Sequence, residues 1–367
     1  MAFSDFQLRR LFTPEPYIVE HRLIPRVHDI FSHRSTHGFA SPSRREFDSL
    51  EDASSFKFNP SGLDLTVGSH IAKSKKLETS LTEIEFFSMN PKKIDGKEHV
   101  LLHNKDGENI YYILSEEKLN LPDKLDYFVD ARSTTGRVGV MCHQAGKLRS
   151  GEVIFAVQPF AFPIKITSGK TSLSQAVVRY GKTGYMSYEK LQENNGKIKF
   201  SRGENDVFIE SLREEGLLMT FSSSFVYKAK DCDEPIDMDS IDEFDPSLYF
   251  EIIEGNGEFA IDARTLYLAG TREIIGLENI CGRISRENPL SGTGLWSHFA
   301  GIVQSGFYGP ITLECYSSVN RKIRDGDPAG FVKFDEINGP VLNSYKGSYQ
   351  NQTAPRLPKM FKQFVKV

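Results

Sequence analysis

The sequence has few cysteines, and their spacing excludes the structures that cysteines usually build. Four occur among 367 residues, at Cys142, Cys232, Cys281 and Cys315, and no two form a CxxC pair. Closely spaced pairs are what thiolate metal sites use, and disulfide frameworks need regular cysteine spacings. We therefore expect no zinc site and no disulfide framework, and we expect these thiols to be free and buried.

Long apolar runs and a surplus of positive charge are also missing. No stretch approaches the roughly 18 to 20 apolar residues of a membrane-spanning helix, and the opening MAFSDFQLRR contains no apolar leader. The formal net charge of -4 provides no global field for a polyanion such as duplex DNA. We expect a cytoplasmic protein whose partners include neither a membrane nor a nucleic acid.

The familiar nucleotide motifs are absent. Zinc-dependent nucleotide deaminases need a His or Cys ligand beside a Glu, followed by PCxxC, because the metal activates water while the Glu moves protons. Neither part occurs here, and there is no GxxxxGK[ST] loop and no strand-borne GxGxxG loop. Chemistry on a nucleotide would therefore have to use other residues.

What is present indicates a folded, mainly β chain. Hydrophobic residues make up 39% and charged residues 26%, a balance typical of globular proteins. Segments 165–180, 264–277 and 309–319 alternate or cluster β-branched and aromatic residues between turns that contain Gly. Helical periodicity is scarce and predicts one helix, over 203–216. Many short strands with regular turns indicate a β-sandwich or a β-barrel.

An internal repeat divides the chain. Segment 109–140 aligns with 265–295 when gaps are allowed, since each has an aromatic-rich strand, an acidic turn and a later Arg and Gly. Segments 151–180 and 309–340 each follow with another pair of strands. Self-similarity of this kind is typical of duplicated architectures, although similar β-rich text also arises by chance.

The repeat sets the expected domain boundaries. Residues 1–57, rich in His, Arg, Pro and Ser, are interpreted as an irregular N-terminal arm. A first barrel is expected over 58–190, a connecting region over 191–246, and a second barrel over 247–355, with a tail that continues to residue 367.

Two segments carry residues suited to chemistry. In ARSTTGRVGV (131–140), Arg132 and Arg137 bracket Ser133, so guanidinium groups, hydroxyls and turn amides are suited to phosphate oxygens, although such turns are often only structural. In GPITLECYSS (309–318), alternation puts Glu314 on the face opposite Leu313. On this pattern alone, the solvent is the favoured environment for Glu314.

Four blocks in order resemble the deoxycytidine triphosphate (dCTP) deaminases of the dUTPase superfamily. They are FNPSGLDLTVG (58–68), ARSTTGRVGV (131–140), SHFAGIVQSGFYGPITLE (297–314) and GPVLNSYKGSYQNQTAP (339–355). The resemblance implies two dUTPase-like, distorted jelly-roll β-barrels in one chain, with few short helices. The double length implies the fused, two-copy form of the family.

The two copies differ in which family residues they keep. The first copy retains Arg132, Ser133 and Arg137 but has Ala156 where the family strand carries its Glu. The second copy retains Glu314. Because family sites are shared between neighbouring barrels, the resemblance implies one site that takes its Arg-Ser turn from the first copy and its carboxylate from the second.

The resemblance also implies a role for each of these residues. Glu314 would be the general base toward a water that attacks C4 of cytosine, and Ser133 would orient that water. Arg132 and Arg137 would bind phosphate and hold the geometry of the site. The second copy's own turn retains Arg283 and Ser285 as candidate substrate-binding residues but has no match for the second Arg.

The tail matches the family less completely. Tyr349 and Gln352 match family triphosphate contacts, and Tyr345 lies in the same block. Ser348 stands where the family has Lys, and Lys346 is expected to compensate for it. One more departure lies outside the tail: Gln304 replaces the Asp that contacts the sugar in the family.

The function implied by the resemblance is zinc-independent hydrolysis of a C–N bond, converting dCTP to dUTP and ammonia and supplying dUTP for thymidylate synthesis. Mg²⁺ would be the counterion of the triphosphate, with no metal ligands from the protein. Three chains with six barrels are the expected assembly. A dUTPase, a bifunctional deaminase and diphosphatase, and a non-catalytic nucleotide sensor are the alternatives.

Overall fold

The structure is a computed structural model. It describes residues 2–3, 18–19, 22–23, 58–60, 62–74, 87–89, 91–94, 97–103, 110–120, 125–145, 150–180, 185–285, 294–338, 341 and 344–362. Most of the expected N-terminal arm lies outside these residues. Within the described part of the chain, no helix is long and apolar enough to cross a membrane.

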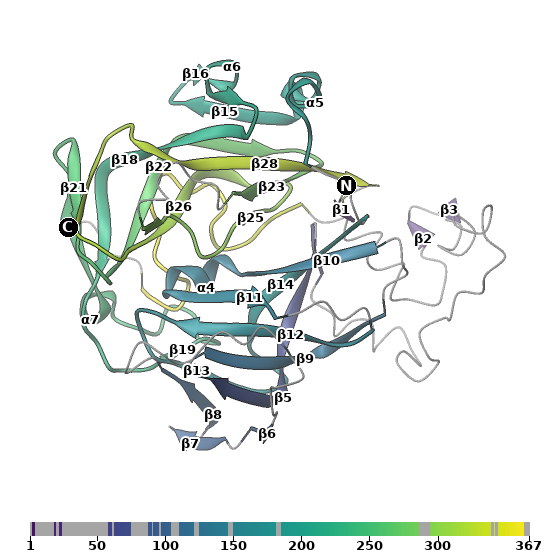
Figure 1. Ribbon diagram of the computed structural model, residues 1–367, viewed down its shortest axis with the longest axis vertical. Coiled ribbons are helices and arrows are strands. Elements are labelled where there is room, and N and C mark those ends of the chain that lie inside the picture. Colours follow the sequence, from purple (N-terminus) through teal and green to yellow (C-terminus); the bar gives the residue numbers. More distant parts are fainter. Residues whose placement is uncertain are drawn as a thin grey trace.

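The first half of the chain forms a closed β-barrel, drawn in blue to teal in Figure 1. Each strand pairs with the next around the ring, in the order β5, β9, β12, β11, β10, β14 and back to β5. These strands are β5 (Gly62–Ser74), β9 (Ile110–Asn120), β10 (Leu125–Ala131), β11 (Val140–Gln144), β12 (Ser150–Pro159) and β14 (Ser172–Tyr180).

A small sheet packs against the core of this barrel. Strand β13 pairs with β8 and, in parallel, with β19, and β8 pairs with β7. The four strands are β7 (Lys92–Ile94), β8 (Lys97–Leu102), β13 (Ile164–Ile166) and β19 (Ile236–Asp237). Strand β19 belongs to the second half of the sequence but pairs with β13 of the first half, so the two halves are interlocked.

The second half repeats the barrel, in green to yellow in Figure 1. Here β18 pairs with β20, β22 and β28, β22 with β15 and β26, and β23 with β25 and β28. The strands are β15 (Ile198–Arg202), β18 (Gly216–Ala229), β20 (Phe250–Glu254), β22 (Leu266–Leu277), β23 (Ile280–Ile284), β24 (Leu295–Trp296), β25 (Ile302–Val303), β26 (Tyr308–Ser317) and β28 (Pro328–Asn338).

Residues 191–246 therefore do more than connect the barrels. They supply β15 and β18, and β18 makes 14 residues of strand in the middle of the second barrel. The alternation in GLLMTFSSSFVYKA is weakened by a run of three Ser, which explains why the sequence pattern did not mark it as a barrel strand.

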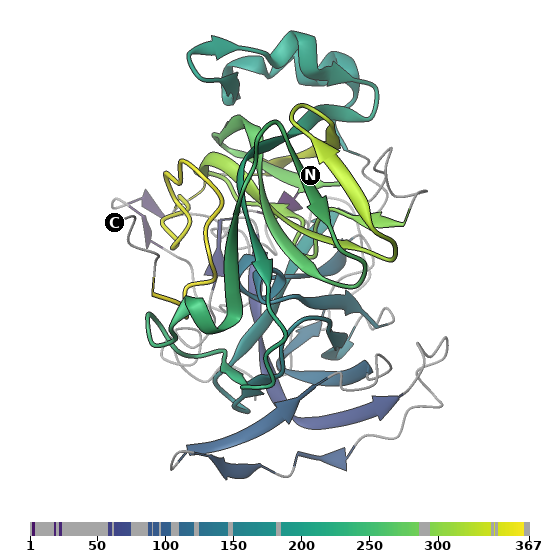
Figure 2. The ribbon, with the colours of Figure 1, turned by 90° about the vertical axis from the view of Figure 1, so that its left-hand side faces the viewer.

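The helix predicted over 203–216 is four residues long. Only α6 (Phe208–Ser211) is helical, and β17 (Leu212–Arg213) then pairs back onto the start of β18. The turn between them ends at Gly216, whose φ of +129° few other residues adopt. With α5 (Tyr188–Glu193) and β16 (Asn205–Asp206), this segment lies at the outer end of the second barrel in both views (Figures 1 and 2).

The remaining elements are short. One further helix, α7 (Pro246–Tyr249), precedes β20, and α4 (Ser133–Arg137) follows β10. Cys142, Cys281 and Cys315 are buried free thiols as predicted, whereas Cys232 is partly exposed. The other short elements are β1 (Ala2–Phe3), β2 (Ile18–Val19), β3 (Arg22–Leu23), β4 (Phe58–Asn59), β6 (Phe87–Ser88), β21 (Glu258–Ile261), β27 (Arg321–Arg324) and the 3₁₀ turn η3 (Asn195–Lys197).

A buried carboxylate marks the duplication in the first barrel. Glu117 accepts a hydrogen bond from the backbone N–H of Thr66 at 2.8 Å. The Ser115 hydroxyl donates to the Glu117 carbonyl at 2.6 Å and accepts from the Val153 N–H at 2.9 Å. Together these bonds tie β9 to both of its neighbours at an irregularity in the ladder.

The second barrel repeats this arrangement at equivalent positions. Glu273 accepts from the Thr220 N–H at 2.7 Å, and the Thr271 hydroxyl donates to the Glu273 carbonyl at 2.9 Å. The same hydroxyl accepts from the Ile311 N–H at 2.9 Å. Two copies of so specific a hydrogen-bond pattern support the predicted repeat independently of sequence alignment.

The strand register shows that Ala156 and Glu314 are also equivalent positions of the two barrels. Ala156 of β12 pairs with Tyr112 of β9, and Glu314 of β26 pairs with Leu268 of β22. Tyr112 and Leu268 each lie five residues before the buried Glu of their own strand. The structure thus places Ala156 and Glu314 at corresponding points of the two barrels.

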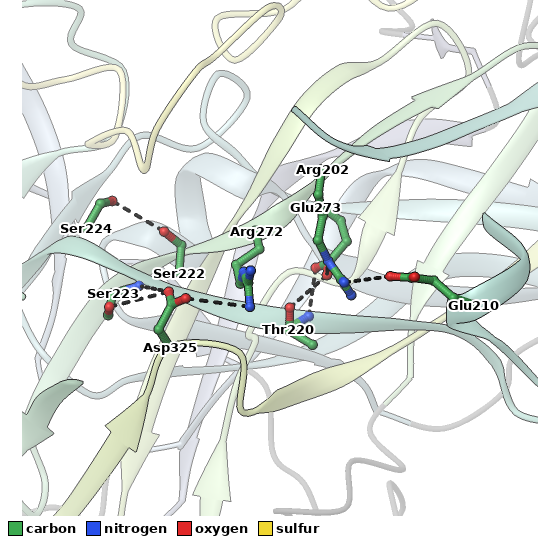
Figure 3. Close-up of polar contacts among 9 residues, drawn as sticks. All are labelled: Arg202, Glu210, Thr220, Ser222, Ser223, Ser224, Arg272, Glu273 and Asp325. Atoms are coloured by element: carbon green, nitrogen blue, oxygen red, sulfur yellow. Dashed lines mark hydrogen bonds and ion pairs between the residues drawn. The ribbon is translucent and has the colours of Figure 1, made fainter. Parts of the chain in front are cut away.

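Glu273 carries one addition that gives a prediction for stability. Arg202 donates from Nε to Glu273 at 2.7 Å and from a terminal nitrogen to Glu210 at 2.6 Å (Figure 3). Glu273 is 1% exposed and Glu210 is 58% exposed. Replacing Glu273 by Ala should cost about 1.5–3 kcal/mol, as expected for a buried charged hydrogen-bond partner. Replacing Glu210 by Ala should cost about 1 kcal/mol or less. Urea unfolding of both variants checks this, and equal losses would contradict it.

The core of the first barrel extends into the second half of the chain. The core cluster of the first barrel includes Tyr249, Phe250 and Leu266 from the second half, and also Met360 and Phe361 from the tail. Phe361 lies 5.1 Å from Tyr249 and 5.5 Å from Phe250, measured between ring centroids. Figure 2 shows the yellow tail beside the green strands of the second barrel. The seam between the barrels is therefore a packed interior.

Candidate functional site

The Arg-Ser turn lies at this seam. It forms α4, which directly follows β10 of the first barrel and packs against β26 of the second. Thr135, Gly136 and Arg137 are buried, whereas Ser133 and Thr134 are partly exposed. The side of α4 that carries Gly136 thus faces the second barrel.

Glu314 meets the turn from the other side. Its side chain is 1% exposed, so the solvent-facing orientation favoured by the strand pattern is wrong. One carboxylate oxygen accepts from the Phe299 N–H at 3.0 Å and from the Ala300 N–H at 3.3 Å. Burial raises the pKa of Glu314 to about 7, against the lowering effects of Arg137 and these two amides. A carboxyl with such a pKa can take up and release a proton near neutrality.

A glycine permits the close approach of turn and carboxylate. A Cβ atom placed on Gly136 would lie 3.1 Å from Cδ of Glu314 and 3.0 Å from Cβ of Ala300. Both distances are tighter than ordinary van der Waals contact. The structure thus brings together the turn of the first copy and the carboxylate of the second, within one chain.

Arg137 is enclosed by the tail. Its terminal nitrogens donate to the Arg356 carbonyl at 2.9 Å and to the Gln352 side-chain oxygen at 3.3 Å. The ring of Tyr349 lies over the guanidinium group, 3.6 Å from centroid to Cζ. Only 3% of the Arg137 side chain is exposed, and its contacts hold the tail and the turn together.

Further contacts fix the tail on either side of Arg137. The Tyr349 hydroxyl lies 2.8 Å from the Thr134 hydroxyl, and Gln352 donates to the Pro310 carbonyl of β26. Further along, Leu357 and Met360 are buried in the seam core. Residues 344–362 therefore form a strap over the site that is anchored beyond it.

These elements enclose a cavity of about 210 Å³. Among the predicted site residues, it is lined by Arg132, Ser133, Arg137, Gln304, Glu314, Tyr345, Tyr349 and Gln352. Arg132 is one-third exposed and pairs with Asp64 at 3.2 Å, so its guanidinium group remains accessible to a ligand. The cavity combines an accessible cation, a hydroxyl and a buried carboxyl.

Three predicted residues lie elsewhere. Arg283 donates to the Tyr185 hydroxyl at 3.0 Å and lies over the ring of Phe128, at the seam but outside the cavity lining. Ser285 follows β23 and also lies outside it, and Lys346 is exposed. Of the second copy's turn the structure describes Arg283, Ile284 and Ser285, and of these three only Ile284 lines the cavity that contains Glu314.

The cavity also contains residues that were not predicted. Asp64 holds Arg132, and its signal was present in the block FNPSGLDLTVG. Gln175 accepts a hydrogen bond from Gln304 at 2.8 Å across the seam. Lys359 also lines the cavity; it lies beyond the tail motif, and no sequence pattern marked it.

Around the equivalent position in the first barrel, the residues that the structure describes form no such site. Ala156 is 2% exposed and packs in an apolar cluster with Tyr112, Ala145 and Ile154. No cluster of three or more His, Cys, Asp or Glu side chains that could hold a metal ion occurs among the described residues. At this position the second barrel has a buried carboxyl group, Glu314, whereas the first barrel has an apolar cluster around Ala156.

Known proteins share both the sequence pattern and the fold. A family model described as dCTP deaminase-like matches residues 43–179 and again 197–332. The dUMP-forming dCTP deaminase of Persephonella marina is 31% identical over 133 residues, 35% of this chain and 74% of that protein. The dCTP deaminase of Metallosphaera sedula is 30% identical over 155 residues, 42% and 86% of the two chains.

A solved structure extends over nearly the whole chain. The crystal structure of 2′-deoxycytidine 5′-triphosphate deaminase from Agrobacterium tumefaciens superposes with a TM-score of 0.67, covering 93% of this chain and 98% of that one. Its sequence is 17% identical, so the likeness concerns the fold. The two matches of the family model account for both barrels, and the chain belongs to the dCTP deaminase-like family.

Proposed function

We propose that the chain hydrolyses the exocyclic amine of dCTP, with Glu314 as general base. The observation that carries this proposal is the buried Glu314 carboxyl, whose pKa of about 7 suits proton transfer, in the same cavity as Ser133 and Arg132. Relatives named dCTP deaminase support the substrate and the bond that is broken.

The reaction adds water across the C4–N bond of cytosine. Glu314 takes a proton from the water as its oxygen bonds to C4, and passes that proton to ring N3. The C4–N bond of the tetrahedral intermediate then breaks, the amine leaves as ammonia with a proton from the attacking water, and C4 keeps its oxygen. Water and dCTP thus give dUTP and ammonia, with no change of oxidation state.

Other residues of the cavity position the reactants. Ser133, at the partly exposed end of α4, would orient the water, and Arg132 would bind a phosphate oxygen while Asp64 holds its other side. Tyr345, Tyr349 and Gln352 would close the cavity over the nucleotide, and Gln304 would face the sugar. Arg137 would hold Glu314 and the tail in register.

A dUMP-forming reaction is the second candidate. Three relatives are named as dUMP-forming dCTP deaminases, which favours a product that has also lost diphosphate. In that case a second water would attack phosphorus in the same cavity. The released phosphate species distinguishes the two candidates.

The remaining parts of the proposal concern setting and assembly. Mg²⁺ would enter with the triphosphate as its counterion, and zinc would not be needed. Cytoplasmic dUTP made in this way would feed thymidylate synthesis. Three chains would associate into six barrels. Chelation followed by readdition of Mg²⁺ or Zn²⁺, and measurement of solution mass, test the metal and assembly proposals.

Incubating the protein with dCTP and Mg²⁺ tests the function directly. We expect ammonia in a one-to-one ratio with dUTP, or with dUMP and diphosphate for the second candidate. dUTP supplied alone should stay intact if the first candidate holds. Tight dCTP binding without ammonia would indicate a nucleotide sensor and refute both reactions.

Replacing Gly136 by Ala should lower activity without unfolding the protein. The added methyl group must displace Ala300 or the Glu314 carboxyl by a few tenths of an ångström. Because small misplacements of catalytic groups are costly, we expect kcat to fall by at least about tenfold. Gly196→Ala is the control at an exposed position, where an added Cβ meets nothing within 4 Å and the backbone φ is not positive. Equal kcat values for Gly136→Ala and wild type would contradict the proposed contact.

A further inference from the structure

Asp130 connects the two barrels immediately beside the site. It is the penultimate residue of β10, which ends at Ala131, and it is 3% exposed. One carboxylate oxygen accepts from the Ala131 N–H at 2.9 Å, and the other accepts from the Gly301 N–H at 3.3 Å. The first bond holds the start of the Arg-Ser turn, and the second crosses the seam to the other barrel.

Gly301 closes the loop that binds Glu314. This loop, residues 297–301, joins β24 to β25, and all five of its residues are buried. Its last residue is held through both backbone groups, because the Gly301 carbonyl accepts from the Ile284 N–H at 2.7 Å and the Gly301 N–H donates to Asp130. Phe299 and Ala300, the two residues before it, donate to Glu314. Their amides move if Gly301 moves.

The fit around Gly301 is tight. A Cβ atom there would lie 3.0 Å from the Asp130 carboxylate and 3.2 Å from the Ile284 carbonyl. Glycine at this position thus lets the loop reach the carboxylate of the other barrel. The contact is a close interbarrel junction rather than a chance approach of flexible groups.

We propose that Asp130 is a positioning residue, which fixes the 297–301 loop so that its amides hold Glu314 in place for proton transfer. It acts through Phe299 and Ala300 and touches no reacting atom. Its catalytic consequence rests on the proposed function of Glu314. The first barrel, which has no counterpart of Glu314, thus supplies the residue that orients Glu314 of the second barrel.

Removing Asp130 has two opposed effects on Glu314. Loss of the loop's anchor weakens the Phe299 and Ala300 hydrogen bonds, which favour the charged carboxylate, so the pKa of Glu314 rises. Loss of a nearby negative charge alone would lower that pKa. The sign of the pKa change of Glu314 therefore separates positioning from simple electrostatics.

Other ionisable groups also face Glu314 or Asp130. They are Arg137 of α4, Cys142 and His143 of β11, His298 of the loop, Cys315 of β26, and Tyr345, Tyr349 and Arg356 near Arg137.

The test is an NMR titration of ¹³C-carboxyl-labelled Glu, with Glu314 assigned from the signal lost in Glu314→Gln. In Asp130→Ala we expect the pKa of Glu314 to rise by about one pH unit, the size of one charge-assisted hydrogen bond. Gly301→Ala disturbs the same junction and keeps the Asp130 charge, so it should also raise the pKa, by a smaller amount. An unchanged or lowered pKa in both variants would overturn the proposal.

Kinetics give a second readout. The acid limb of the kcat profile should move to higher pH in Asp130→Ala, with KM changed by less than about threefold, because an interaction used in the chemical step is lost. Asp237→Asn is the matched control, since Asp237 is another buried aspartate that accepts a backbone N–H, outside the cavity lining. The titration needs no turnover, so an inactive wild type would refute the proposed function separately.

Discussion

Replacing Glu314 by Gln should lower ammonia release from dCTP by about 100- to 10,000-fold, the usual contribution of a general base. The amide cannot take a proton from water, but it keeps the shape of the side chain and one acceptor for the Phe299 and Ala300 amides. Nucleotide binding should therefore change by less than about threefold. Steady-state assays and calorimetric titration with dCTP measure the two quantities.

Glu117→Gln is the matched control. Glu117 is also a buried carboxyl on a barrel strand, and burial raises its pKa too, but it lies in the first barrel away from the cavity lining. Its replacement should leave kcat of the folded enzyme unchanged. Similar losses in both variants would show that Glu314 acts through stability, and full activity in Glu314→Gln would remove it from the mechanism.

The raised pKa of Glu314 also fixes the direction of the pH dependence. A general base must be unprotonated, so kcat should increase with pH through a midpoint near 7. Stability should change in the opposite direction: the folded state binds the proton more tightly than the unfolded chain, so stability is lost as pH rises from about 4.5 through 7. Glu314→Gln should remove this loss, which urea unfolding at pH 6 and pH 8 would detect.

The duplication and the barrel fold could be predicted because each depends on local patterns. Strand alternation and the ordered motif blocks survive in both copies, and the pairing of Glu314 with the first copy's turn followed from which residues each copy retains. The second barrel's early strand β18 was missed because its three consecutive Ser interrupt the apolar alternation.

The rest of the site depends on tertiary packing that no local pattern reveals. The burial of Glu314 results from the 297–301 loop, which precedes it in the same motif block, and from α4, which belongs to the other barrel. Lys359 lines the cavity beside Met360 and Phe361, which are buried in the core of the first barrel, and no local pattern shows that this part of the tail returns to the site. The enclosure of Arg137 by the tail could not be predicted, because the motif around Arg137 carries no information about residues 349–356.

Replacing Arg137 by Ala should be the second most damaging change, with kcat/KM for dCTP lowered by about 100-fold. The variant loses both hydrogen bonds to the tail and the stacking with Tyr349, which is worth about 0.5–2 kcal/mol. The pKa of Glu314 should also rise, because the charge that lowers it is gone. Arg137→Lys should recover only part of the activity, since an ammonium group lacks the planar fork that reaches Arg356 and Gln352.

Arg283→Ala is the control for Arg137→Ala, because Arg283 is another arginine at the seam between the barrels. Arg283 likewise lies over an aromatic ring, 4.0 Å from the centroid of Phe128, and donates to a hydroxyl, but it belongs to the second copy's turn. If the site combines the first copy's turn with the second copy's carboxylate, Arg283→Ala should retain most of the activity, and its midpoint for the acid limb should match that of wild type. A silent Arg137→Ala with an inactive Arg283→Ala would reverse the assignment of the copies, because the turn that serves Glu314 would then come from its own barrel.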